Sequence, residues 1–138
     1  MALSPKRSTA AVNKEADQVV ALLNSGKLII YSGTQPANAN TTAGAGVKLA
    51  TLTFNATAAP AASGGVATFN AIASDTNAVA GTAAWFRCNK TANVDVTDTI
   101  FDGSVGTPSG YDLNLNSVAI SNGATVAVTS FTYTANPG

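Results

Sequence analysis

Apolar side chains in the first 27 residues recur at helical spacing. They lie on one face: Val12, Ala16, Val19, Val20 and Leu23, with Leu22 at its edge. Ser8 or Thr9 can cap the start of the helix, and the segment 24–26 (Asn-Ser-Gly) can end it. The pattern predicts an amphipathic helix preceded by a short basic arm. Such a helix either covers one edge or end of its own domain or docks on a neighbouring subunit.

From residue 28 onwards the pattern becomes that of β-strands, with short apolar or alternating runs separated by Gly, Asn, Ser and Pro. In the central run 82–88, Trp85 and Arg87 share one face, and Phe86 and Cys88 share the other. The segment 37–46 is expected to be a long exposed connection. The predicted strands are 28–31, 49–54, 66–72, 82–88, 94–101, 111–115, 118–120 and about 125–134.

Three local signals refine this assignment. Asp102-Gly103 is expected to close the strand 94–101, and Asn122-Gly123 is a hairpin-turn signal. In the last strand the large residues change phase, because Val126 and Val128 are even-numbered whereas Phe131 and Tyr133 are odd-numbered. A bulge or bend near Thr129-Ser130 would explain this change.

The small size of most apolar side chains favours a thin core. The hydrophobic fraction is 46%, but much of it is alanine. A β-sandwich core about 10 Å thick suits such a composition. We therefore predict a mainly β protein whose β-sandwich is a jelly roll of about eight strands. One N-terminal amphipathic helix precedes it. The arm and helix occupy residues 1–27 and the sandwich residues 28–138.

Charge is sparse and balanced. Seven Lys and Arg residues oppose seven Asp and Glu residues among 138, so the formal net charge is zero. No basic stripe with interleaved aromatic residues occurs, which argues against nucleic-acid binding. No segment has the roughly 20 apolar residues of a membrane span, and the N-terminus lacks the apolar region of a secretory signal. We expect neither a membrane nor a nucleic acid as partner.

The side chains of common catalytic sites are scarce. The chain has no histidine and one cysteine, Cys88, which we expect to be buried and inert. Hydroxyl groups are plentiful, but no base is placed to activate one. These features predict a protein that is not an enzyme, with no cofactor and no catalytic residues.

Acidic residues and aromatic residues leave two weaker alternatives. A calcium site would draw on two groups of oxygen-bearing side chains, but their spacing does not match a calcium loop: Asp95, Asp98 and Asp102, and Asp112, Asn114 and Asn116. Polar faces and turns account for these groups better, so no metal site is predicted. A glycan-binding module would use exposed aromatic residues among Tyr31, Trp85, Tyr111 and Tyr133.

Four segments carry a resemblance to a known group of proteins. They are Leu28-Ile29-Ile30-Tyr31-Ser32-Gly33-Thr34-Gln35-Pro36, Gly81-Thr82-Ala83-Ala84-Trp85-Phe86-Arg87, Asp102-Gly103-Ser104-Val105-Gly106 and Asp112-Leu113-Asn114-Leu115-Asn116. Together they resemble small virion proteins of tailed bacteriophages, above all the capsid cement or decoration proteins, some of which are jelly rolls. The similarity spans roughly residues 28–134 and also fits a tail or other virion component.

The resemblance implies a structural function. A cement protein binds the outer capsid surface as a dimer or trimer and ties subunits of the major capsid protein together. It is made in the host cytoplasm and resides in the virion. The expected partners are therefore the major capsid protein and the protein itself. The residues expected to touch them lie in the arm: Leu3, Pro5, Lys6 and Arg7.

Overall fold

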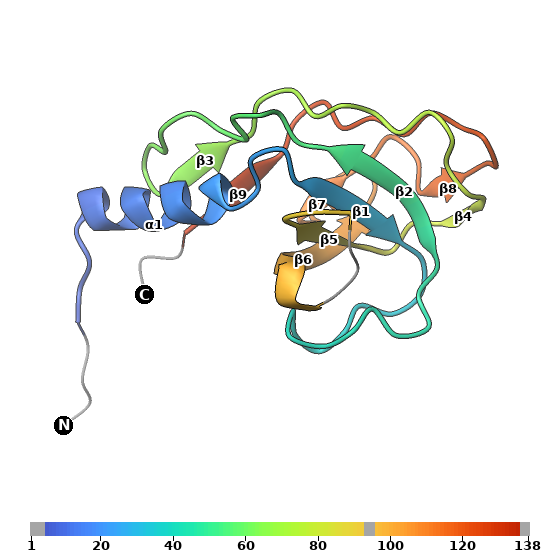
Figure 1. Ribbon diagram of the computed structural model, residues 1–138, viewed down its shortest axis with the longest axis horizontal. Helices are drawn as coiled ribbons and strands as arrows, with labels where there is room; N and C mark the ends of the chain where they lie inside the picture. The colour runs from blue at the N-terminus through green and yellow to red at the C-terminus, as the bar shows by residue number, and fades with distance from the viewer. Residues whose placement is uncertain (1–4, 93–95, 136–138) are drawn as a thin grey trace.

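The computed structural model describes residues 5–92 and 96–135. Within them the chain forms a mainly β protein with one α-helix (Figure 1). The elements in order are α1 (Thr9–Ala21), β1 (Lys27–Tyr31), β2 (Lys48–Thr53), β3 (Val66–Thr68), β4 (Gly81–Thr82), β5 (Trp85–Asn89), the 3-10 turn η1 (Val96–Asp98), β6 (Thr99–Gly106), β7 (Leu113–Asn114), β8 (Ala119–Ile120) and β9 (Thr132–Thr134).

Five strands form a curled sheet in the order β2-β1-β5-β6-β7. Its neighbours are antiparallel except β6 and β7, which are parallel. Two short antiparallel ribbons, β3–β9 and β4–β8, complete the described strands. The structure thus confirms the mainly β class and the helix. It does not establish an eight-stranded jelly roll, which stays a prediction.

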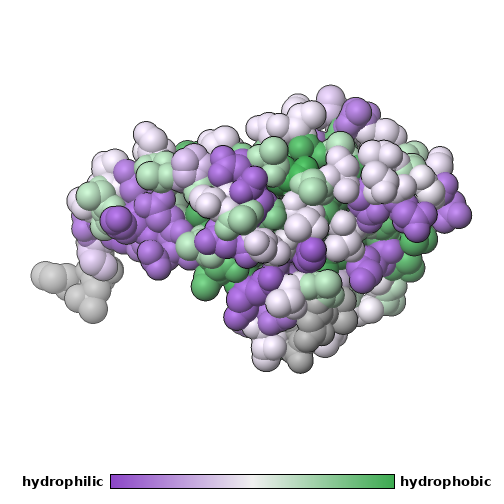
Figure 2. Space-filling view, turned by 45° about the horizontal axis from the view of Figure 1, so that its top comes forward, coloured by the Kyte–Doolittle hydropathy of each residue, from purple (hydrophilic) through white to green (hydrophobic). Residues whose placement is uncertain are grey.

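The helix covers the β3–β9 ribbon of its own domain. Ser8 caps it, because its Oγ accepts a hydrogen bond of 3.2 Å from the Ala11 amide. The buried face carries Val12, Ala16 and Val20, which belong to the same core cluster as the strands. The exposed side of the helix mixes charged and polar side chains with small apolar ones (Figure 2). Of the two positions predicted for the helix, packing on its own domain is the one observed.

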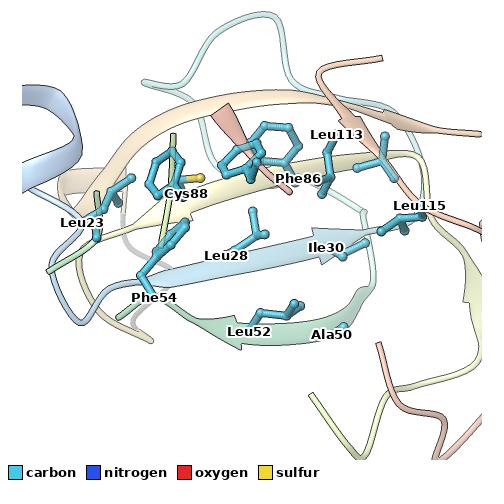
Figure 3. Close-up of a cluster of buried hydrophobic side chains, with 14 of the residues drawn as sticks. Leu23, Leu28, Ile30, Ala50, Leu52, Phe54, Phe86, Cys88, Leu113 and Leu115 are labelled. Carbon is cyan, nitrogen blue, oxygen red and sulfur yellow. The ribbon is translucent and has the colours of Figure 1, made fainter. Parts of the chain in front are cut away.

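The main core lies on one face of the sheet (Figure 3). Leu28 and Ile30 of β1 and Phe86 and Cys88 of β5 point into it. The shared face of Phe86 and Cys88 is the one that the alternation of the run 82–88 predicted. Phe131, which precedes β9, meets Phe86 edge to face with the ring centroids 5.3 Å apart. This contact packs the β3–β9 ribbon against the sheet.

The other face of β1 and β5 is buried as well. Ile29, Tyr31 and Trp85 form a second apolar cluster, in which the Tyr31 and Trp85 rings stack with centroids 4.4 Å apart. Trp85 Nε1 donates a hydrogen bond to the Ser32 carbonyl, and Ala43 packs against the cluster. The largely exposed connection 33–46 therefore also helps to cover the sheet.

Several predicted strands differ from the observed ones. The run 66–72 forms a strand only over β3, the run 82–88 is interrupted between β4 and β5, and the run 111–115 forms a strand only over β7.

The strand predicted over 94–101 differs at both ends. The prediction that Asp102-Gly103 closes a strand is wrong, because β6 runs through both residues to Gly106 while it pairs with β5. The start of that predicted strand is also wrong where it can be examined, because Val96–Asp98 form a 3-10 turn. Residues 94 and 95 lie outside the described residues.

The predicted last strand, 125–134, is shorter in the structure. The chain bends near Thr129, so that Val126 bridges to Asp75 whereas β9 pairs with β3. The predicted change of phase is confirmed, because the buried side chain before the bend is at an even-numbered position, Val126, and the one after it is at an odd-numbered position, Phe131. A turn does form at Asn122-Gly123, but the hairpin is wrong because β8 before the turn pairs with β4.

Candidate functional site

The N-terminal arm lies at the surface beside the start of α1. Pro5, Lys6 and Arg7, three of the residues predicted to contact a partner, are exposed and adopt no regular structure. The fourth, Leu3, lies outside the described residues. Figure 1 shows this segment leading away from the helix, at the opposite end of the molecule from β4 and β8. The described part of the arm is therefore accessible to solvent.

A weak contact ties the arm to the helix. Arg7 Nε lies 3.1 Å from Glu15 Oε2, and both side chains remain more than one third exposed to solvent. An exposed ion pair of this kind contributes about 0–1 kcal/mol to stability. Arg7 also borders a small hollow formed with Val12, Gly64 and Gly65.

A larger hollow of about 410 Å³ lies between β6 and β9, and we refer to it as the β6–β9 groove. Its lining residues are Phe86 of β5, Phe101 and Asp102 of β6, Tyr111 and Asp112 before β7, and residues 131–134. Phe101 and Tyr133 contact each other with ring centroids 5.1 Å apart. The groove thus combines aromatic surface with carboxylate and threonine hydroxyl groups.

Tyr111 is held on one wall of this groove by a glycine. A Cβ atom at position 106 would lie 2.2–2.3 Å from the Tyr111 ring, so the ring packs directly on the Gly106 backbone. Asn114 exchanges hydrogen bonds with the backbone of Tyr111, through Oδ1 at 3.3 Å and Nδ2 at 3.2 Å. The Tyr111 side chain is fixed in this way although the residue is 46% exposed.

Asp112 occupies the rim of the groove. Its Oδ2 accepts hydrogen bonds of 2.8 Å from both the amide and the hydroxyl of Ser104 on β6. Asp112 is nevertheless exposed, so its negative charge remains in contact with solvent. The rim can therefore attract a cation, whereas the two bonds keep the carboxylate in a fixed position.

Asp102 carries its charge in a different setting. It forms two hydrogen bonds with the Arg87 guanidinium, and both side chains are almost fully buried. Its charge is thus neutralised within the sheet. Of the two groove carboxylates, Asp112 is the one available to a ligand.

The other titrating groups near the sheet are held in their neutral forms. Burial raises the pKa of the Cys88 thiol well above its ordinary value, and the charge of Asp102 adds to this effect. Burial also raises the pKa of Tyr31, although nearby Arg87 opposes the shift. A buried, protonated thiol is a poor nucleophile. Cys88 is buried, as the sequence predicted, and acts as part of the core.

The residues considered for metal or glycan binding are distributed between several places. Asp112 and Asn114 lie beside Tyr111, whereas Asp98 accepts from the Thr91 hydroxyl on another loop, and Asp95 is outside the described residues. Within residues 5–92 and 96–135, no three His, Cys, Asp or Glu side chains gather as a metal-binding group. The same residues include no helix with the length and apolar character needed to cross a membrane.

The four candidate aromatic residues separate into two pairs. Tyr31 and Trp85 are buried under the sheet and cannot serve as a surface platform. Tyr111 and Tyr133 lie in the β6–β9 groove. Sequence reasoning did not find this groove, because it depends on strands far apart in the chain. A faint signal was the glycine five positions before an aromatic residue, Gly106 and Tyr111.

No family model matches the chain, and no curated protein or solved structure is significantly similar to it.

Proposed function

We propose that the protein is a non-enzymatic cement protein of a tailed-phage virion, which binds the outer surface of the capsid and stabilises the shell. The observation that carries this proposal is the exposed basic arm, attached to a helix that is packed firmly on a rigid β domain. The resemblance of the segments between residues 28 and 116 to cement proteins supports the same function. The arm is the proposed contact with major capsid protein or with a sister subunit.

The physical character of the surface suits this function. With a formal net charge of zero, long-range electrostatic steering is weak, so binding would depend on buried area and on backbone hydrogen bonds. Individual contacts of this kind can be modest. Many copies bound to one shell, each bridging several capsid subunits, make the total effect large. A homo-oligomer would increase the number of contacts that each bound unit makes.

The finer fold assignment belongs to the same proposal. We infer a jelly-roll sandwich in which the curled sheet is one layer and the β3–β9 ribbon contributes to the other. The aromatic contacts of Phe131 with Phe86 and Phe101, at 5.3 and 6.3 Å between ring centroids, support two layers around one core. A short second layer is consistent with the small number of large apolar side chains in the sequence.

Binding to phage capsids that lack the protein tests this function. Purified protein is incubated with such capsids, and the bound fraction is measured after sedimentation together with the temperature at which the shells release DNA. We expect saturable binding and a higher release temperature. A protein that neither sediments with the capsids nor changes the release temperature would refute the proposal.

A deletion defines the contribution of the arm. Removing residues 1–7 leaves the Ser8 cap and α1 intact, so the domain should fold normally while capsid binding weakens. The matched control is Lys14→Ala, which removes another exposed basic side chain from the helix. Unchanged binding after the deletion would exclude the arm from the interface.

A further inference from the structure

The strand β6 has an unpaired edge along the β6–β9 groove. The Val105 amide donates to the Ala84 carbonyl, which places the backbone groups of residues 101, 103 and 105 on the β5 side. The Ser104 amide points the other way, to Asp112. By the same alternation the backbone groups of Asp102 face away from β5, whereas the register shift at Cys88/Asn89 interrupts the alternation at Ile100. Among the described residues, no strand lies beside this part of β6, because β7 begins its pairing at Val105.

The strand β9 has a similar edge. The Phe131 carbonyl accepts from Phe69 and the Ala135 amide donates to Gly65, so both face the β3 side. Alternation then directs the backbone groups of Thr132 and Thr134 away from β3. The described residues place no further strand there. Two strand edges with free hydrogen-bonding groups therefore flank one groove.

Such edges bind extended peptide segments. An unpaired strand edge is a template for an added strand, in which backbone hydrogen bonds supply affinity and side-chain contacts supply specificity. The groove offers Tyr111 and Tyr133 to apolar side chains and Asp112 to a cation. A suitable occupant is thus an extended, basic segment that contains a few apolar residues.

The N-terminal arm has these properties. Its sequence Leu3-Ser4-Pro5-Lys6-Arg7 combines two positive charges with apolar residues, and a proline is tolerated in a strand at an edge. Residues 5–8 are exposed and take part in no helix or strand. The ion pair from Arg7 to Glu15 is exposed, and a pair of this kind contributes only about 0–1 kcal/mol.

We propose that the arm of a second copy of this chain lies in the β6–β9 groove, with Lys6 or Arg7 beside Asp112. Figure 1 shows the described part of the arm leaving the molecule at the N-terminal end of α1, the end of the helix farther from β6. The positive charges of Lys6 and Arg7 complement the exposed carboxylate of Asp112, and the open strand edges supply backbone hydrogen bonds to an extended segment. Two copies that exchange arms reciprocally form a closed dimer, and a cyclic exchange forms a closed ring. This inference rests on the homo-oligomer of the proposed function and names its interface.

Two measurements on the full chain test the arm exchange. The first is the solution mass from size-exclusion chromatography with light scattering at micromolar concentration, compared between the full chain and the variant lacking residues 1–7. The second is amide hydrogen exchange at Asp102, Thr132 and Thr134, followed by NMR. We expect the full chain to be a dimer or larger with slow exchange at these amides, and the deletion variant to be a folded monomer with fast exchange.

Charge variants identify the contact at the rim. Asp112→Asn keeps an oxygen that can accept from Ser104 but removes the negative charge, so association should weaken several-fold. The control Asp75→Asn changes a carboxylate that bonds to the Thr51 amide at the distant β2 edge, and it should leave association unchanged. Lys6→Glu should weaken association as Asp112→Asn does.

Each contrary result overturns the inference in a recognisable way. An oligomer whose mass and amide exchange are unaffected by the deletion would retain self-association but exclude this interface. A monomer in which the arm slows exchange would show that the groove holds its own arm. A monomer whose Tyr111 and Tyr133 resonances shift on addition of maltohexaose would show a glycan site instead. Capsid binding is measured separately, so the proposed function can survive all three results.

Discussion

Arg87 on β5 and Asp102 on β6 lie directly opposite each other and form a buried, two-bonded ion pair. The distances are 2.7 Å from Nε to Oδ1 and 2.8 Å from Nη2 to Oδ2, and the side chains are 1% and 4% exposed. The Arg87 guanidinium also lies 5.4 Å from the centre of the Trp85 ring. The pair therefore links the central strand β5 to its neighbour β6 on the face opposite the main core.

Removing one partner of this pair should be strongly destabilising. Asp102→Asn leaves the Arg87 charge buried without a counter-ion, and the expected loss is about 3–5 kcal/mol of unfolding free energy. Urea denaturation followed by Trp85 fluorescence measures it. The double variant Arg87→Met with Asp102→Leu removes both charges and should lose much less. A single variant no less stable than the double variant would contradict a buried pair.

Gly106 is required because of the ring beside it. Gly106→Ala places a methyl group within 2.2–2.3 Å of Tyr111, so either the ring or the strand must move. We expect a loss of about 1–3 kcal/mol, as for other overpacked sites. In the Tyr111→Ala background the same substitution should cost little, because the clash is gone. Equal costs in both backgrounds would show that strain in the backbone, and not the ring, selects glycine.

Two adjacent leucines distinguish the buried and exposed sides of the chain at the end of α1. Leu23 is fully buried, whereas Leu22 is 52% exposed. Leu23→Ala should therefore lower the unfolding free energy by about 2–5 kcal/mol. Leu22→Ala should change it by less than about 0.5 kcal/mol. Chemical denaturation of the two variants tests this difference, and similar losses would mean that the helix is rotated from its described position.

Cys88 should make stability depend on alkaline pH. Because burial raises the pKa of its thiol well above the ordinary value of 9.0, the thiol ionises in the unfolded chain before it does so in the folded protein. Its contribution is fully present below pH 9.0 and is lost as the pH rises towards the folded-state pKa. The resulting slope for this group is at most about 1.4 kcal/mol per pH unit.

Denaturation curves of the wild type and Cys88→Ala between pH 8 and 10 isolate this contribution. The wild type should lose stability more steeply than the variant as the pH rises above 9.0. Tyr31 acts in the same direction, but its effect begins near its own ordinary value of 10.0. Parallel curves would contradict the raised pKa. In addition, the native thiol should resist a thiol reagent until urea unfolds the protein.

Local sequence patterns predicted the parts of the fold that depend on neighbouring residues. The buried face of α1 and the alternation of Phe86 and Cys88 are examples, because the period of apolar residues determines which side is buried. The change of phase before β9 was also visible, since the chain bends where the large side chains move from even to odd positions.

Features that depend on distant segments were not predictable in this way. The strand β6 continues through Asp102-Gly103 because β5 offers it a partner, although the dipeptide resembles a turn. The burial of Tyr31 and Trp85 requires the connection 33–46 to cover their face. The β6–β9 groove exists because β9 pairs with β3 and leaves its other edge open. Pairings of this kind are tertiary and leave no periodic signal in either strand.

The number of copies in purified virions tests the proposed function most directly. The proposal places the gene in a tailed phage. Virions of that phage are purified, and the protein and the major capsid protein are quantified together by mass spectrometry with isotope-labelled peptides. A cement protein must be present in a simple fixed ratio to the major capsid protein. Absence from the virion, or the few copies expected of a tail component, would contradict the proposal.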